Sequence, residues 1–131
     1  MKKLIILFFF ISTSCFSSVF AQDLRRNGST FGKVESDGTV RMSGSAKGKF
    51  EKDGTIRVKG STVGKIESDG TIRKSGSTIG KVERDGTIRI KGSTVGKIED
   101  DGTIRKSGST IGTAKGVRKE YAAILFFFDF F

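Results

Sequence analysis

The sequence predicts an all-β protein of five repeated 16-residue β-hairpins, followed by a hydrophobic tail that forms a helix or a strand. Three observations lead to this fold class. A 16-residue segment is repeated five times over residues 28–107, and its last three copies are nearly identical. Glycine makes up 18 of the 131 residues and recurs at fixed places in the repeat, as turns require. Between these glycines, apolar and polar residues alternate, which is typical of strands with one buried face.

The first turn of each repeat contains an Asp-Gly pair. In the third copy, a two-residue Asp-Gly loop would pair Ile66 with Arg73 and bury the arginine. A three-residue loop ending at Gly70 instead pairs Ile66 with Ile72 and Lys65 with Arg73. Only the second register places both isoleucines on one face. We therefore expect a three-residue turn with Gly70 in the left-handed conformation.

The second turn of each repeat has two residues. In the third copy it is the Ser-Gly pair at 75–76, which would pair Ile72 with Ile79. An Asn-Gly pair at 27–28 is the strongest signal of this kind, because both residues tolerate the backbone that such a turn needs. It indicates a first strand over residues 22–26.

The two turns together require an irregularity in the longer strand. Ile79 and Val82 would both face inward, although residues three apart lie on opposite faces of a regular strand. We expect a bulge or bend at Gly80, so that the hairpins are bent and lean round a common axis. The same place is held by Gly32, Gly48, Gly64, Gly96 and Gly112.

The expected core is a set of apolar residues that these pairings turn inward. It consists of Phe31, Val34, Val40, Phe50, Ile56, Val63, Ile66, Ile72, Ile79, Val82, Ile88, Val95, Ile98, Ile104 and Ile111. Lys47 is the exception, because it stands where the other copies have an apolar residue. We expect it to weaken the second repeat or to mark an opening there.

The chain begins with the pattern of a secretory signal peptide. Two lysines precede an apolar run over residues 4–11, and a Val-Phe-Ala sequence ends at Ala21. We expect residues 1–21 to be the signal peptide, 22–112 the hairpin repeat domain and 113–131 the hydrophobic tail. The protein would then be exported, and periplasmic or extracellular. A lipoprotein anchored through Cys15 is the less favoured alternative, because Ser12 stands where a leucine is usual.

Composition argues against an enzyme. The chain has no histidine, and its single cysteine lies in the expected signal peptide. General acid–base and nucleophilic catalysis most often depend on such side chains. The aspartates and glutamates recur at repeat positions, where turn formation and pairing with cations explain them better than calcium binding. We expect no catalytic residues, no cofactor and no metal.

The formal net charge of +10 raises the question of an acidic partner. Each three-residue turn places a lysine opposite an arginine, and such like charges need screening by nearby glutamates. A solvated outer face is the simpler interpretation. The alternative is a site for an acidic envelope polymer, such as lipopolysaccharide or an anionic glycan. Its candidate residues are Lys65, Arg73, Lys81, Arg89, Lys97 and Arg105. Nucleic acid is not expected, because aromatic residues do not interleave with these cations.

The tail carries apolar residues at helical spacing, at Val117, Tyr121, Ile124 or Leu125, and Phe128. The apolar run is too short to span a bilayer. It would form a helix or strand that plugs the core or covers one mouth of the ring. Alternatively, it would be an exposed patch that meets a protein partner or a membrane surface.

The repeat resembles that of the secreted bacterial 5-fold β-flower proteins. The resemblance rests on the pattern S-x-x-G-K-I-E-x-D-G-T-I-R, on Phe-Ala-Gln at 20–22 and on Lys-Gly-Val-Arg-Lys-Glu-Tyr-Ala-Ala at 115–123. It implies five hairpins arranged radially and brings no known activity. The expected function is thus that of a secreted or periplasmic, non-catalytic structural or interaction module.

Overall fold

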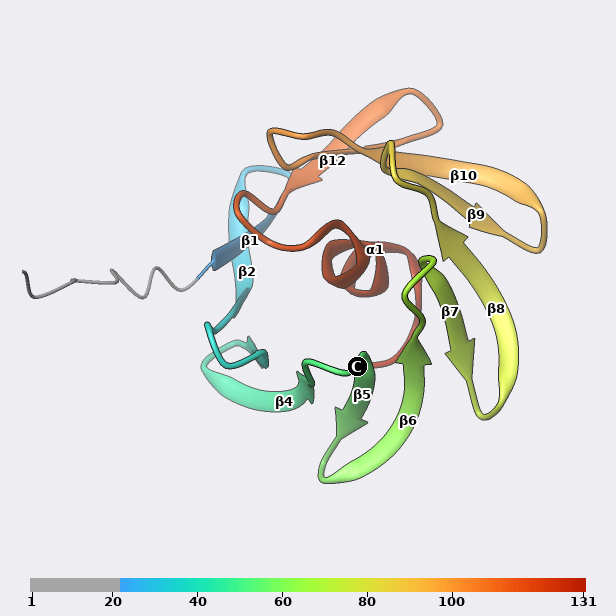
Figure 1. Ribbon diagram of the computed structural model, residues 1–131. Coiled ribbons are helices and arrows are strands. Elements are labelled where there is room, and N and C mark those ends of the chain that lie inside the picture. Colours follow the sequence, from blue (N-terminus) through green and yellow to red (C-terminus); the bar gives the residue numbers. More distant parts are fainter. Residues whose placement is uncertain (1–21) are drawn as a thin grey trace, which may run out of the picture.

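The computed structural model describes residues 22–131, which form twelve antiparallel strands and one helix. The strands close into a barrel in which each one pairs with its neighbours in sequence, and the helix lies in the middle (Figure 1). The strands are β1 (Gln22–Arg26), β2 (Ser29–Val34), β3 (Thr39–Met42), β4 (Ser45–Phe50), β5 (Thr55–Val58), β6 (Ser61–Ile66), β7 (Thr71–Lys74), β8 (Ser77–Val82), β9 (Thr87–Ile90), β10 (Ser93–Ile98), β11 (Thr103–Lys106) and β12 (Ser109–Thr113). The prediction of radially arranged hairpins is confirmed. The expected signal peptide and Cys15 lie outside the described residues.

The three-residue turn has the predicted register. Ile66 pairs with Ile72, and Lys65 pairs with Arg73. Gly70 has φ +89°, a left-handed backbone that glycine adopts without a steric penalty. Its amide donates to the carbonyl of Glu67 at 3.0 Å, which closes the turn.

The two-residue turns join the strands at the outer tips of the hairpins. Ser75 and Gly76 have φ values of 51° and 81°, so both are left-handed, as a type I′ turn requires. Asn27 has the same conformation with φ 52°. The predicted first strand is confirmed as β1.

The bulge is confirmed, but the expected pairing of Ile72 with Ile79 was wrong. Ile72 pairs with Gly80, and the register shifts between Ile72 and Arg73. Ile79 is thus the extra residue of the bulge, so it does not reach full burial. The partly buried bulge residues are Phe31, Val63, Ile79, Val95 and Ile111, which pack against the core instead of forming it.

The core is a ring of fully buried side chains that point at the helix. Its strand residues are Leu24, Val34, Val40, Phe50, Ile56, Ile66, Ile72, Val82, Ile88, Ile98 and Ile104, each at most 4 % exposed. Successive repeats also interlock, because the amide of Val82 donates to the carbonyl of Gly70 at 2.9 Å. Lys47 is exposed, and it contributes nothing to this core.

Strand β1 closes the ring. It pairs on one side with β2 and on the other with β12, where Arg25 lies opposite Thr113 and Arg26 opposite Gly112. The five repeats supply β2 to β11, and β1 and β12 complete the twelve strands. We call the junction of β1 with β12 the seam.

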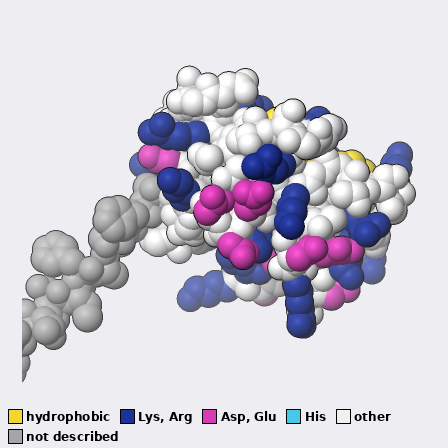
Figure 2. Space-filling view, turned by 90° about the horizontal axis from the view of Figure 1, so that it is seen from above, with side chains coloured by type: hydrophobic (Ala, Val, Ile, Leu, Met, Phe, Trp, Pro, Cys, Tyr) yellow, Lys and Arg dark blue, Asp and Glu magenta, His cyan; other side chains and the backbone are white. Residues whose placement is uncertain are grey.

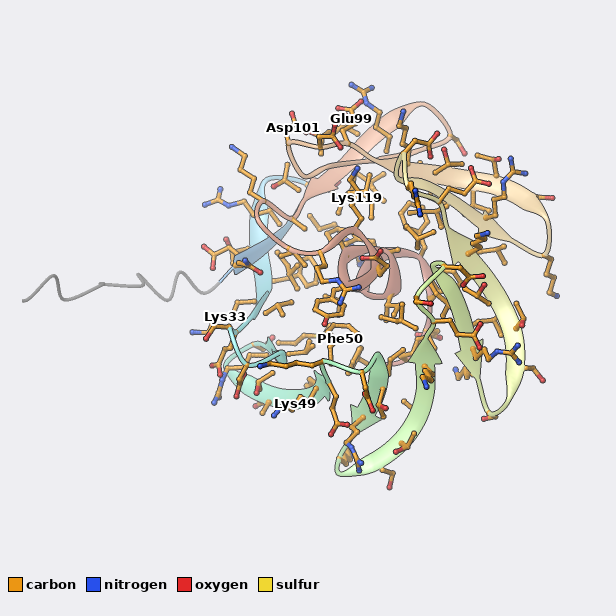
Figure 3. All side chains as sticks on the ribbon, viewed as in Figure 1. Lys33, Lys49, Phe50, Glu99, Asp101 and Lys119 are labelled. Carbon is orange, nitrogen blue, oxygen red and sulfur yellow. The ribbon has the colours of Figure 1, made fainter. Side chains whose placement is uncertain are left out.

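The tail forms helix α1 (Lys119–Phe127), which fills the centre of the ring (Figure 1). Ala122, Ala123, Ile124 and Leu125 are buried there. Phe50 points toward the helix, whereas Lys33 points away from the ring (Figure 3). The Phe50 ring stacks on Tyr121 with centroids 4.2 Å apart and an interplanar angle of 3°. The tail is therefore a helical plug that belongs to the core, and within residues 22–131 no helix is long and apolar enough to cross a membrane.

Five phenylalanines from the end of the helix and the residues after it run round the ring, one for each of five hairpins. A Cβ atom placed on the bulge glycine of each hairpin would come within 2.7 Å of a phenylalanine ring carbon. The pairs of this phenylalanine belt are Phe126 with Gly112, Phe127 with Gly96, Phe128 with Gly80, Phe130 with Gly64, and Phe131 with Gly48. The sixth bulge glycine, Gly32, faces Met42 instead. A cavity of about 330 Å³ lies beside Met42, between Phe126 and Phe131.

Candidate functional site: the charged outer face

Cations and carboxylates are intermixed on the side of the ring that Figure 2 shows. Because Ile66 and Ile72 face inward, their neighbours Lys65 and Arg73 face outward. The same cross-strand pair occurs in all five repeats, as Lys33 with Arg41, Lys49 with Arg57, Lys65 with Arg73, Lys81 with Arg89, and Lys97 with Arg105. The structure thus brings the six candidate residues together in three neighbouring repeats.

Each arginine is held by the glutamate six residues before it. Arg73 Nε lies 2.6 Å from Glu67 Oε1, and Arg73 Nη1 donates to the carbonyl of Gly76 at 3.4 Å. The two side chains are 42 % and 37 % exposed, so solvent still screens the pair. The other pairs are Arg41 with Glu35, Arg57 with Glu51, Arg89 with Glu83, and Arg105 with Glu99, at 2.5–2.9 Å. The glutamates therefore neutralise the arginines more directly than they neutralise the lysines.

The lysines of the candidate site are exposed, and each lies near a turn aspartate of the preceding repeat. The backbone amide of Thr71 donates to Asp69 and lowers the pKa of that carboxyl, with help from the Thr71 hydroxyl. The charge of Lys81 lowers the pKa of Asp69 further. The equivalent contribution to the pKa of Asp85 comes from Lys97. Lysines and aspartates of adjacent repeats are thus electrostatic neighbours round the ring.

This arrangement suits electrostatic contact better than bond-making chemistry. The lysines offer mobile donors at the surface, whereas the arginines are fixed by their glutamates and turn carbonyls. Asp69 uses its carboxylate on the turn, and Glu67 uses its carboxylate on an arginine. In the described part of the chain, no group of three or more His, Cys, Asp or Glu residues could hold a metal ion.

Sequence reasoning missed the partner of each arginine. It assigned the glutamates to screening of the lysine–arginine pair, whereas they bind the arginines across the turn. The signal was present, since every Glu of the repeat is followed six residues later by Arg. In a three-residue hairpin turn, that spacing places the two residues diagonally on one face.

A closed ring of antiparallel hairpins, a central helical plug and a charged outer face define a repeat protein of the all-β class. The family model described as 5-fold beta-flower protein matches residues 21–131, and the chain belongs to this family. The comparisons found no matching curated protein and no matching solved structure.

Proposed function

We propose that the protein is an exported, non-catalytic interaction module of the cell envelope, either periplasmic or extracellular. The observation that carries this proposal is the repetition of one charged motif five times round the outside of a closed ring. Such repetition suits a partner that also repeats, because several weak contacts then form together. The signal-peptide pattern at residues 1–21 supports export.

The non-catalytic part of the proposal rests on how the polar residues are used. Each repeat devotes its aspartate to a turn amide and its glutamate to an arginine. The same bonds recur in the other four repeats. Residues that occur five times in one structural role are explained by the fold.

Fractionation of producing cells, with the intact mass of the product, tests the export proposal. We expect a soluble chain beginning at Gln22 in the periplasm or the medium. A cytoplasmic product that retains residues 1–21 would contradict export. A lipid-modified chain beginning at Cys15 would place the protein on a membrane and replace the soluble form proposed here.

A second function, binding of an acidic envelope polymer such as lipopolysaccharide or an anionic glycan, is favoured by the exposure of three candidate lysines. Lys65, Lys81 and Lys97 are exposed and lie in equivalent positions of successive repeats. Their partners Arg73, Arg89 and Arg105 add charge but are tied to glutamates. We expect the lysines to dominate such binding, and we expect no binding to nucleic acid.

Salt-dependent retention on an immobilised acidic polysaccharide tests this second function. Changing Lys65, Lys81 and Lys97 to glutamine should lower the salt concentration needed for elution, because exposed charges act through screened Coulomb attraction. The matched control changes Lys59, Lys91 and Lys106, which are exposed near hairpin tips, and removes the same charge. If both triple variants lowered the eluting salt concentration equally, net charge alone would explain the retention. That result would contradict a site on this face.

A further inference from the structure

A cleft lies at the seam, where β1 meets β12. Its volume is about 930 Å³, within the usual range for small-molecule sites. Its polar lining consists of Gln22, Asp23, Arg25, Asn27, Thr110, Thr113 and Lys115. We call it the seam cleft.

The ladder of arginine–glutamate pairs is broken at the seam cleft. Thr113 pairs with Arg25 as Lys97 pairs with Arg105, so Arg25 is the seam's counterpart of the repeat arginine. The glutamate position, two residues beyond Thr113, is held by Lys115. The seam therefore has two cations where each repeat has an ion pair.

In the part of the chain that the structure describes, Arg25 forms no ion pair with a carboxylate. Within residues 22–131, the ion pairs involve neither Arg25 nor Lys115. Residues 1–21 contain no aspartate or glutamate. The nearest acid along the strand, Asp23, lies opposite Lys33 in the register of β1 with β2. The positive charge of Lys115 is partly balanced by Asp101, because Lys115 is among the causes that lower the pKa of that carboxyl.

From these observations, we propose that the seam cleft binds an acidic sugar unit, with Arg25 and Lys115 holding its anionic group. An arginine beside a lysine is suited to a carboxylate or a sulfate. The amides of Gln22 and Asn27 and the hydroxyls of Thr110 and Thr113 can both donate and accept, as sugar hydroxyls require. The five repeats lack this combination, because their arginines are already paired.

This site is independent of the lysines of the outer face. It uses the polar groups that line one cleft, whereas polymer binding on the repeats needs charges spread over three neighbouring repeats. The triple change of Lys65, Lys81 and Lys97 to glutamine should therefore leave binding at the seam cleft unchanged. Failure of one proposal does not imply failure of the other.

The test is an NMR titration of the chain of residues 22–131, which contains every strand, the helix and the whole core of the structure. The probes are glucuronate, inorganic sulfate and glucose. We expect saturable shifts at residues 25 and 110–115 with glucuronate, and binding of sulfate and glucose at least tenfold weaker. Absence of saturable shifts with glucuronate overturns the proposal. If sulfate bound as tightly as glucuronate, the cleft would be a site for free anions, and the sugar assignment would be overturned. If glucose bound as tightly as glucuronate, the role of the anionic group would be overturned.

The decisive variant is Lys115→Glu, which restores the residue of the repeats and gives Arg25 a glutamate partner. We expect glucuronate binding to weaken at least tenfold while the melting temperature stays the same or rises. The matched control, Lys91→Glu, makes the same charge change at an exposed hairpin tip and should bind as the unmodified chain does. Unchanged binding by Lys115→Glu, or equal loss in both variants, would overturn the proposal.

Discussion

The ring of Phe128 lies directly against the backbone of Gly80, so closely that a Cβ atom on Gly80 would stand 2.6 Å from the ring. The same Cβ atom would lie 2.5 Å from the carbonyl oxygen of Arg89 on the neighbouring strand. Glycine at this bulge therefore serves two purposes. It allows the strands to approach, and it leaves room for an aromatic ring of the belt.

Substitution of this glycine should destabilise the fold through overpacking. We expect Gly80→Ala to lower the free energy of unfolding by about 1–3 kcal/mol. Phe128→Ala should cost a similar amount, about 1–3 kcal/mol, because the ring is only partly buried. Urea unfolding of both single variants and of the double variant measures their coupling. Asp129→Ala, an exposed change within the same segment, is the control and should stay within about 0.5 kcal/mol of the unmodified chain. Strict additivity of the two single changes would contradict the contact.

Phe50 distinguishes the second repeat from the others, which have Ile or Val at this place. Its ring stacks on Tyr121 and meets Phe131 edge to face at 5.6 Å. We expect Phe50→Ile to cost about 1–3 kcal/mol, from the lost aromatic pairs and a smaller side chain. Ile98→Val, at the equivalent position of the fifth repeat, should cost about 0.5–1.5 kcal/mol. Thermal unfolding compares the two variants, and an equal or smaller loss for Phe50→Ile would argue against Phe50 as the anchor of the helix.

The pair of Glu67 with Arg73 should couple weakly and lose strength in salt. Both side chains are more than a third exposed, so a double-mutant cycle with glutamine at each position should give about 0.2–1 kcal/mol. The coupling should shrink when the salt concentration is raised, because exposed charges are screened. A parallel cycle on Glu67 and Arg89, which form no pair, should be additive. A coupling that does not respond to salt would mean that the pair is not acting through its charges.

The turn aspartates make the stability of the fold depend on pH. Thr71 donates to Asp69 and holds the pKa of that carboxyl below its ordinary value, and the equivalent threonines do the same in the other repeats. Since the folded pKa is the lower one, the unfolded chain binds more protons. The contribution to stability is present above the ordinary aspartate pKa of about 4 and is lost as the pH falls through the folded pKa.

Urea unfolding at pH values between about 6 and 2 measures this loss. We expect the midpoint to fall steadily below about pH 4. Asp69→Asn should lose less stability over the same pH range than the unmodified chain, because one of the five titrating turns has been removed. A midpoint that does not change with pH would contradict the role of these carboxylates.

The register of the three-residue turn could be predicted from the sequence, because a one-residue error would have buried Arg73 in place of Ile72. The position of the bulge could not be predicted from the sequence. Taking either Ile79 or Gly80 as the extra residue restores the alternation of inward and outward side chains. In the structure Ile72 pairs with Gly80, so Ile79 is the extra residue. The closure of β1 on β12 was also missed, because pairing of the first and last strands is non-local and leaves no turn signal. At the candidate site, the lysine–arginine pairs were predicted, but their glutamate partners were not.

The central claim is that the tail forms part of the core. If it does, the outer face is the surface left for contact with a partner. A chain that ends at Gly116 lacks helix α1 and the whole phenylalanine belt. Its unfolding in urea, followed by circular dichroism and compared with that of residues 22–131, is the most direct measurement. We expect the shortened chain to aggregate or to lose its cooperative transition, because the core side chains of the ring would face an empty centre. A soluble, cooperatively folding chain of residues 22–116 would contradict this, and it would make the tail an exposed contact for a partner.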